Sequence, residues 1–545
     1  MISMKLVLLF ILFSPVYVYA DINETVFVES TTDTDSDGVL DLIAVTIDRP
    51  STTEKLPVIL KMSPYSQGGN SLDFHDTDVD LLPQDQALEA SAKKRSFHSK
   101  SNVFKNQETD KLSGYANVYA DSVGTGKSTG CPTVGDMSET LGAKAVIDWL
   151  NGRARAFNSN GEEVKATWSN GNVGMIGVSY NGTLPIMVAT TGVEGLKAII
   201  PIAAISNWYD YYRANGLVVN PGGYIGEDAD ILGQYVVRKN ACKKELSIIT
   251  QTMGREHGDF SSFWQKRDYL KKAKDIKAAV FLAHGQADWN VKQKQAIQLF
   301  EALDEQTPKR LFLHLGAHSY PSDRGFRNNV DLWFDHYVKG VDNGIDKKLP
   351  IRIQTIGETI AKEQSLWPHE STFRQVFTLG NGEVKKIIDI GSKNKLETFV
   401  KNPTNENSNR LVYMSKPLEN DTLFSGTANV QLTLSLINRR AANITVALVQ
   451  FKGNSVGKII TRGWADPQNH LDFNEGELLN PGQKIQLKFK LEPKQFIMKK
   501  GYQLGVLIAS TDYSYTLRPS IGTEIEIFTG KDSFVEFEAD SKIQF

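Results

Sequence analysis

Buried strands alternate with helices between residues 114 and 340, and this alternation constrains the fold more than any other feature of the chain. Apolar runs such as "GNVGMIGVS" and "AAVFLAHG" each precede a segment with helical spacing of its apolar residues. Strands that lack a polar face and are joined by helices form parallel sheets covered on both sides. The pattern therefore predicts an α/β fold whose functional side chains follow the carboxyl ends of the strands.

The rest of the chain predicts three additions to this sheet. Residues 24–62 contain strand-like runs that open the same unit. Between about residues 205 and 276 a helical, charged and aromatic segment without an evident strand interrupts the alternation, and it predicts a cap over the strand ends. After residue 349, short alternating runs predict a β-sandwich of the jelly-roll type. We therefore expect an α/β domain with a helical cap over residues 21–349 and an all-β domain over residues 350–545.

The charge balance argues against two classes of partner. The 61 basic and 63 acidic residues nearly cancel, and no long basic block is present. Neither nucleic acid nor an anionic membrane surface is therefore expected as a partner.

The first twenty residues, "MISMKLVLLFILFSPVYVYA", have the layout of a secretory signal peptide, with Lys5 before an apolar run and Ala20 at its end. An uncleaved anchor is the alternative, but the apolar run is short for a membrane span. We expect a mature chain that begins near Asp21, is secreted or periplasmic, and has no stable membrane anchor. In such a compartment Cys131 and Cys242 are able to pair, although their spacing alone does not decide it.

The stretch "MIGVSYNGTL" places Ser179 between a buried strand and a helix. This is the context of a nucleophile elbow, in which glycines allow a sharp turn that lifts the serine hydroxyl out of the sheet. Gly177 and Gly182 would supply that freedom. Asn181 stands where the pattern G-x-S-x-G has its second glycine, so a serine in an ordinary glycine-rich loop is the alternative.

A serine nucleophile requires a histidine held by a carboxylate, in the chain order serine, acid, histidine for an α/β-hydrolase. Asp288 follows one predicted strand and His318 follows the next, so both are expected at the same sheet edge as Ser179. Taken singly, Asp288 is equally typical of a helix N-cap and His318 of a surface loop. Weaker candidates are two histidines inside predicted strands and two other acids: His284, His314, Asp304 and Asp323.

The tetrahedral intermediate of such a reaction also needs fixed hydrogen-bond donors. The backbone N–H of Tyr180, directly after the serine, is one expected donor of this oxyanion hole. Tyr65, in the loop after an earlier predicted strand, is the expected source of the second.

Two runs of the sequence closely resemble the Xaa-Pro dipeptidyl-peptidase family of serine peptidases. They are "DWLNGRARAFNSNGEEVKATWSNGNVGMIGVSYNGTL" and "VATTGVEGLKAIIPIAAISNWYDYYRANGLVVNPGGYIGEDAD". That family includes cocaine-esterase-like and α-amino-acid ester hydrolases, and its serine motif is G-x-S-Y-x-G, in which Asn181 is regular. The resemblance implies the triad Ser179, Asp288 and His318, with Tyr65 and the Tyr180 amide as the oxyanion hole.

The resemblance also implies a substrate pocket. Trp208 and Tyr211, with Trp289 and Val291 after the acid, look like the walls of a proline pocket, because flat aromatic rings bury a rigid pyrrolidine at small entropic cost. Glu227 looks like the carboxylate that pairs with the free α-amine of the substrate, and Asp228 is an alternative. As alternatives without a functional role, the aromatic residues would pack in an ordinary core and Glu227 would lie at a solvated helix start.

The expected function is release of Xaa-Pro dipeptides from proline-containing peptides with a free N-terminus, with no cofactor. The alternative is an α-amino-acid ester hydrolase or a cocaine-esterase-like acyl hydrolase, and an alternative of another class is a non-catalytic binding protein on a hydrolase scaffold. Longer members of the family carry a helical N-terminal domain associated with dimerisation. Here strands begin at about Asp21, so the sequence leaves a homodimer undecided.

The acidic stretch "DTDSDGVLD", from Asp33 to Asp41, has the spacing of a calcium loop. It lacks the glutamate expected at the twelfth position, where Ala44 stands. An acidic hairpin turn built on Asp-Gly explains the same residues. We therefore expect no metal site there.

Overall fold

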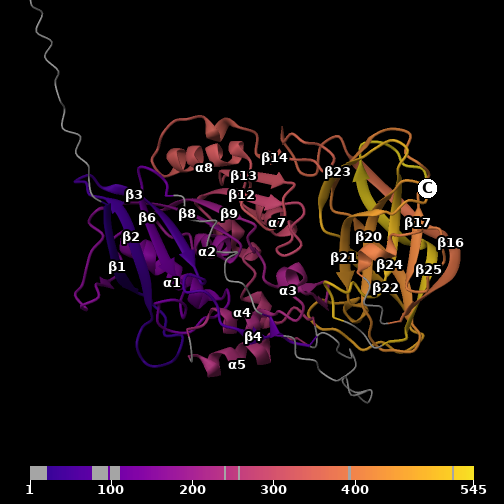
Figure 1. Ribbon diagram of the computed structural model, residues 1–545, viewed down its shortest axis with the longest axis horizontal. Helices are drawn as coiled ribbons and strands as arrows, with labels where there is room; N and C mark the ends of the chain where they lie inside the picture. The colour runs from indigo at the N-terminus through magenta and orange to yellow at the C-terminus, as the bar shows by residue number, and fades with distance from the viewer. Residues whose placement is uncertain are drawn as a thin grey trace, which may run out of the picture.

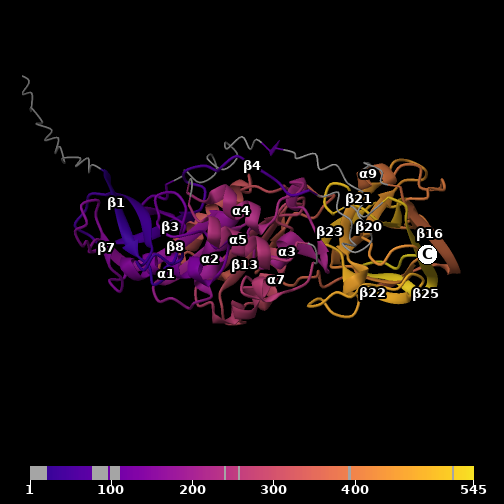
Figure 2. The ribbon, with the colours of Figure 1, turned by 90° about the horizontal axis from the view of Figure 1, so that it is seen from below.

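The computed structural model describes residues 21–76, 96–97, 111–238, 241–255, 258–390, 395–517 and 521–545. The expected signal peptide lies outside these ranges. An α/β domain and an all-β domain lie side by side along the long axis of the molecule, as both views show (Figures 1 and 2). Helices α3 (Tyr209–Tyr212) and α7 (Lys294–Ala302) are drawn at the side of the α/β domain that is nearest the all-β domain (Figure 1).

An eleven-stranded sheet forms the centre of the α/β domain, in the order β15-β14-β13-β12-β9-β8-β3-β6-β2-β1-β7. Neighbours from β14 to β6 in this order are parallel, and the remaining pairs are antiparallel. The strands are β1 (Asp21–Glu29), β2 (Leu42–Pro50), β3 (Leu56–Ser63), β6 (Ala116–Asp121), β7 (Ala156–Phe157), β8 (Ser169–Val178), β9 (Leu196–Ile202), β12 (Ala279–Gly285), β13 (Lys309–His314), β14 (Ile351–Ile353) and β15 (Lys362–Gln364). A separate short pair joins β4 (Leu72–Asp73) to β5 (Ser96–Phe97).

Helices cover both faces of this sheet, as continuous apolar strands require. On one face α1 (Met137–Leu150), α2 (Tyr180–Ala189) and α7 (Lys294–Ala302) share a core with the strands. On the other face α8 (Arg324–Tyr337), followed by η3 (Ile345–Lys347), packs Phe326 and Trp333 against Phe281 of β12. The predicted α/β fold is therefore confirmed.

The segment between β9 and β12 is the expected cap. It contains α3 (Tyr209–Tyr212), β10 (Arg213–Ala214), β11 (Leu217–Val218), η1 (Pro221–Gly223), α4 (Ala229–Val236), α5 (Lys243–Thr252), α6 (Ser262–Gln265) and η2 (Leu270–Asp275). The expectation that it holds no strand is wrong. Asn215 and Gly216 both have positive φ, 48° and 82°, and so turn β10 into β11 as an Asn-Gly hairpin.

A disulfide fastens the cap to the sheet. Cys131, in the loop between β6 and α1, is bonded to Cys242 at the start of α5, with the two Cα atoms 5.6 Å apart. The pairing that the sequence left open is therefore made in the structure.

The C-terminal domain consists of two antiparallel sheets packed over a shared apolar core. The larger sheet holds β16 (Phe373–Asp389), β18 (Thr422–Gly426), β19 (Asn429–Leu436), β22 (Lys484–Lys490), β23 (Lys494–Met498) and β25 (Thr523–Ala539). The smaller holds β17 (Arg410–Met414), β20 (Ile444–Phe451), β21 (Lys458–Ala465) and β24 (Gln503–Ala509), and α9 (Leu396–Phe399) and η4 (Pro467–Asn469) lie in connections. The all-β prediction is confirmed, while the jelly-roll topology stays a prediction.

The junction between the domains differs from the expected division at residue 349. Both β14 and β15 lie after that point, yet they extend the α/β sheet. These three-residue strands are too short for periodicity to identify. The segment after β14 also reaches the other domain, because Ile356 exchanges backbone hydrogen bonds with Gln495 and Ile497 around β23.

Within the described part of the chain, we find no helix whose length and apolar character would let it cross a membrane.

Candidate active site

The turn at Ser179 is a strained elbow between β8 and α2. Ser179 has φ 64° and ψ −128°, in a region that residues other than glycine seldom adopt. The glycines around it cannot be replaced without a clash, because a Cβ at Gly177 would lie 2.3 Å from the carbonyl oxygen of Asn181 and one at Gly182 would lie 2.6 Å from that of Gly177. Strain of this kind holds a serine hydroxyl at the end of a strand, which is what a nucleophile requires.

The acid and the histidine meet at the same edge of the sheet. Asp288 follows β12 and His318 follows the parallel neighbour β13, and His318 Nδ1 donates a hydrogen bond to Asp288 Oδ2 at 2.7 Å. With its proton on Nδ1, the neutral imidazole carries its acceptor at Nε2. That buried Nε2 has no hydrogen-bond partner among the described residues, so it is available to take a proton.

The charge of Asp288 is stabilised locally. Burial alone would raise its pKa, but the neighbouring His318 and His284 outweigh burial and lower the pKa to about 2. His284 is fully buried and bonds through Nε2 to the carbonyl of Val291, as a core histidine does. Burial lowers the pKa of His314 to about 4, so this histidine is uncharged at neutral pH. The two weaker histidine candidates, His284 and His314, are therefore buried side chains of the strands, and His284 also stabilises the charge of Asp288.

The expected oxyanion donors flank the serine. Tyr180 is the first residue of α2, where backbone N–H groups have no acceptor within the helix. Tyr65 follows β3, the strand next to β8, and its ring centroid lies 6.1 Å from that of Tyr180. Burial raises the pKa of Tyr65 well above 10, so the hydroxyl keeps the proton that it would donate to an oxyanion.

Glu139, which the sequence analysis did not single out, holds Tyr180 in place. Its buried carboxylate accepts hydrogen bonds from the Tyr180 hydroxyl at 2.7 Å, from the backbone N–H of Gly135 at 2.7 Å and from Ser122. In the sequence Glu139 is only an acid in the first turn of a helix capped by Asp136, a common pattern that gives no sign of this contact.

Aromatic side chains of the cap surround the residue after the nucleophile. Trp208 is fully buried, and its ring centroid lies 4.9 Å from that of Tyr180 and 5.9 Å from that of Tyr211. The indole N–H of Trp208 donates to the hydroxyl of Tyr269 at 2.9 Å. The structure therefore brings Trp208 and Tyr211 together beside the elbow.

Glu227 and Asp228 are adjacent but differ in their partners. Asp228 is fully buried between Arg213 and Arg255, with closest N–O distances of 3.1 and 3.0 Å, so its charge is already compensated. Glu227 accepts a hydrogen bond from the Tyr212 hydroxyl at 3.1 Å and has no salt bridge within the described residues. Burial raises the pKa of Glu227 to about 8. A cationic ligand would therefore be drawn to Glu227 rather than to Asp228.

The other two pocket residues lie on the acid loop, residues 286–293. The Trp289 ring faces the C-terminal domain, with its centroid 6.2 Å from that of Trp464 and 6.1 Å from that of Tyr515. Val291 is fully buried. Among the described residues, the ring of Trp289 does not contact the rings of Trp208 or Tyr211, although the Tyr211 hydroxyl reaches the same loop by donating to Asn290 Oδ1 at 2.8 Å.

The acidic loop near the N-terminus gathers three carboxylates. Oxygens of Asp33, Asp35 and Asp37 lie within 4.8 Å of one another. Both oxygens of Asp33 accept backbone N–H groups within the loop, and Asp41 is buried and bonded to Thr32 and Thr34 instead. These bonds are those of an acidic turn, in which Asp37 is exposed and Asp33 and Asp35 are half-buried.

Two family models cover most of the chain. Residues 37–320 match the model of the X-Pro dipeptidyl-peptidase (S15 family), and residues 343–541 match that of the X-Pro dipeptidyl-peptidase C-terminal non-catalytic domain. Among similar solved structures, a CocE/NonD family hydrolase from Staphylococcus aureus has a TM-score of 0.70 at 16% identity and covers 97% of each chain. An α-amino acid ester hydrolase has a TM-score of 0.65 at 15% identity, covering 96% of this chain and 97% of the other. At these identities the likeness shows a shared fold.

Sequence relatives extend over nearly the whole chain. A protein of Bacillus anthracis whose provisional name is Xaa-Pro dipeptidyl-peptidase is 42% identical over 523 residues, covering 92% of this chain and 86% of the relative. The Xaa-Pro dipeptidyl-peptidase of Ligilactobacillus salivarius is 34% identical, covering 91% of this chain and 74% of the relative. With the elbow, the His318–Asp288 pair and both family models on one chain, this protein belongs to the S15 family of X-Pro dipeptidyl-peptidases.

Proposed function

We propose that this protein is a serine peptidase that releases Xaa-Pro dipeptides from peptides with a free N-terminus. The observation that carries the proposal is Glu227, a carboxylate with a raised pKa and no cationic partner among the described residues, in a cap that also lines the elbow with aromatic rings. Membership in the S15 family and the names of the relatives support the same activity.

In the proposed reaction the Ser179 hydroxyl attacks the carbonyl carbon of the second substrate residue. His318 Nε2 takes the serine proton, and Asp288 holds the imidazole in the tautomer that this transfer requires. The Tyr65 hydroxyl and the Tyr180 N–H donate to the oxygen that becomes negative in the tetrahedral intermediate. His318 then gives the proton to the leaving amine, and water hydrolyses the acyl-enzyme by the same steps in reverse order.

Specificity follows from two contacts at fixed separation. Glu227 would pair with the substrate ammonium group, and the rings of Trp208 and Tyr211 would pack against proline at the second position. A buried charge without a partner is costly. A peptide whose N-terminus is blocked or displaced cannot form the ion pair with Glu227 and therefore binds weakly. The separation between Glu227 and Ser179 would thus limit cleavage to the bond after the second residue.

The test compares release of a chromogenic amine from Ala-Pro with release from N-acetyl-Ala-Pro, together with hydrolysis of simple acyl esters and of α-amino acid esters. We expect cleavage of the free Ala-Pro substrate at a kcat/KM at least a hundredfold above that of the acetylated one. Hydrolysis of α-amino acid esters without cleavage of Ala-Pro amides would replace the proposal by an ester hydrolase. No turnover of any substrate, with Ser179 unmodified by serine-directed reagents, would favour a binding protein.

We further propose that the protein is exported and acts outside the cytoplasm. The layout of residues 1–20 supports this, as does the Cys131–Cys242 disulfide, because such bonds persist in oxidising compartments. Cell fractionation with N-terminal sequencing tests it: a mature chain that begins near Asp21 outside the cytoplasm is expected, and an unprocessed cytoplasmic chain would refute it.

A further inference from the structure

The C-terminal domain forms hydrogen bonds with the loop that carries the proposed catalytic acid, Asp288. The Gln286 carbonyl accepts a hydrogen bond from the Lys494 ammonium, and Gln286 Oε1 accepts one from the Gln495 backbone N–H at 3.1 Å. At the other end of the loop, the Gln293 side-chain amide donates to the carbonyl of Pro493. Three consecutive residues therefore bond to both ends of the acid loop: Pro493, which precedes β23, and Lys494 and Gln495 at its start.

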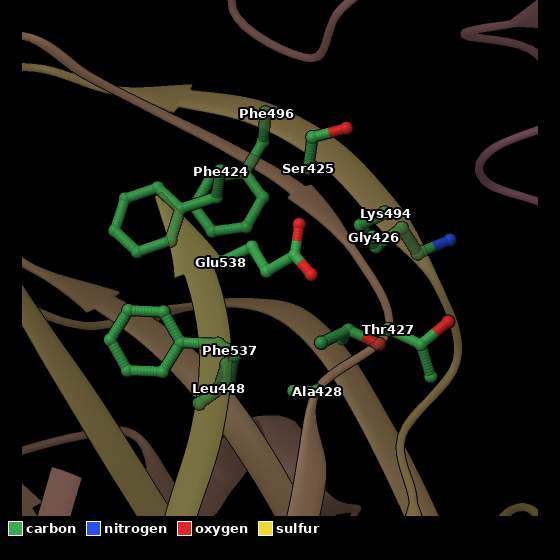
Figure 3. Close-up of a pocket in the computed structure, with 11 residues that line it drawn as sticks. Phe424, Ser425, Gly426, Thr427, Ala428, Leu448, Lys494, Phe496, Phe537 and Glu538 are labelled. Carbon is green, nitrogen blue, oxygen red and sulfur yellow. The ribbon is translucent and has the colours of Figure 1, made fainter. Parts of the chain in front are cut away.

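The ammonium group of Lys494 contacts the acid loop rather than the interior of its own domain. Figure 3 shows that its amino group points away from the small pocket inside the β-sandwich and away from the Glu538 carboxylate, which points into that pocket. The pocket has a volume of about 20 Å³, room for about one water molecule. Lys494 is 4% exposed, and burial lowers its pKa to about 8, although the charges of Glu492 and Asp288 partly offset this effect.

Trp289, the residue after Asp288, makes a second set of contacts between the acid loop and the C-terminal domain. The Lys494 ammonium and the Arg462 guanidinium each lie 4.9 Å from the centroid of its ring. Cations at this distance from an indole attract it. The Trp289 carbonyl accepts the N–H of Gly222 at 2.9 Å, so the same residue ties the acid loop to the cap.

The C-terminal domain also fixes the cap loop that carries Glu227. The Asn220 N–H donates to the carbonyl of Tyr515 at 2.7 Å, and Val219 pairs with Thr516 in an isolated bridge. The Asn220 side chain then accepts the N–H of Gly226 at 3.1 Å. A chain of bonds therefore runs from the second domain to the residue before Glu227.

We propose that the C-terminal domain is a positioning part of the active site, in which Lys494 sets the loop of Asp288 and Asn220 sets the loop of Glu227. Neither residue is a catalytic residue. The two contacts act on different steps: one on the geometry that activates Ser179, the other on recognition of the substrate amine. A misplacement of about 1 Å in a catalytic constellation costs on the order of a hundredfold in rate, which is why such fastening has kinetic consequences. The Asn220 part of this inference rests on the proposed function of Glu227.

The experiment compares Lys494→Met with Asn220→Ala in the full chain. Each variant is assayed for kcat and KM on the free Ala-Pro substrate, normalised to the concentration of titrated active sites, and for its rate of inactivation by diisopropyl fluorophosphate. We expect Lys494→Met to lower kcat and the inactivation rate about tenfold with KM unchanged. We expect Asn220→Ala to raise KM about tenfold with kcat and the inactivation rate unchanged. Lys499→Met, an exposed lysine just after β23 that pairs with Asp421, is the matched control and should change neither constant.

Lys494 is buried, so Gln286→Leu provides a second route to the same contact from the acid loop and should repeat the kcat signature. A purely structural role would lower the fraction of active sites and leave kcat, KM and the inactivation rate per site unchanged in all three variants, which would overturn the proposal. Because the fluorophosphate reports on Ser179 whatever the natural substrate is, an error in the proposed substrate would leave the Lys494 result intact. Such an error would appear instead as a failed comparison of free and acetylated Ala-Pro.

Discussion

His318 Nδ1 and Asp288 Oδ2 lie 2.7 Å apart although thirty residues separate them in the chain. They meet because β12 and β13 are adjacent and parallel, so the loops after both strands leave the same edge of the sheet. This hydrogen bond fixes the proton of His318 on Nδ1 and leaves Nε2 as a hydrogen-bond acceptor.

Asp288→Asn should therefore lower kcat by about four orders of magnitude with little change in KM, because an amide at this position favours the wrong imidazole tautomer. Steady-state kinetics on a chromogenic Ala-Pro substrate measure the effect. Asp304→Asn, at one of the two weaker acid candidates, should leave kcat unchanged. A fall of less than tenfold for Asp288→Asn would remove Asp288 from the triad.

Glu227→Gln should raise KM for a free-amine peptide about thirtyfold, because a charged hydrogen bond contributes roughly 2 kcal/mol. The wild-type carboxyl, with a pKa of about 8, is largely protonated at pH 6, so the ratio of wild-type to variant kcat/KM should rise from pH 6 to pH 8 as Glu227 ionises, because every other titrating group is common to both proteins. Kinetics across pH 5.5–9 test both effects. Glu194→Gln, at an exposed glutamate, is the control. An unchanged preference for free over acetylated Ala-Pro would exclude Glu227 as the amine anchor.

The same substitution should stabilise the fold. A carboxyl whose pKa is raised on folding opposes folding once the pH exceeds its unfolded value near 4.3, and this cost is complete above pH 8. Glu227→Gln should thus raise Tm more at pH 8 than at pH 5. A Tm that falls equally at both pH values would indicate a packing defect instead.

The pair Cys131→Ser and Cys242→Ser should lower the free energy of unfolding by about 2–5 kcal/mol, since the bond closes a long loop in the unfolded chain. Urea unfolding with and without reductant tests this. Reductant should shift the wild-type midpoint and leave the double variant unchanged. Equal midpoints for wild type and double variant in oxidising buffer would show that the bond does not form in solution.

The elbow at Ser179 and the meeting of Asp288 with His318 could be predicted from the sequence because their signals are local. Gly177 and Gly182 mark a turn that no side chain would permit, and Asp288 and His318 each follow a strand directly. The Asn215-Gly216 dipeptide is an equally local turn signal, but its two-residue strands are too short to show a strand period.

Other features depend on contacts between distant segments. Glu139 meets the hydroxyl of Tyr180 across 41 residues, and nothing near Glu139 in the sequence indicates that contact. Trp289 was expected as a pocket wall, yet the rings beside it, Trp464 and Tyr515, come from a domain that begins after the catalytic sheet ends. The short β14 and β15 join that sheet only because β13 offers an edge to pair with.

The most direct test of the central claim is mass spectrometry of the products from an unmodified peptide that begins Ala-Pro. The wild type should release the intact Ala-Pro dipeptide and should not cleave the same peptide after N-acetylation, and Ser179→Ala should cleave neither. Release of free alanine, cleavage of the acetylated peptide at a comparable rate, or undiminished activity in Ser179→Ala would contradict this claim.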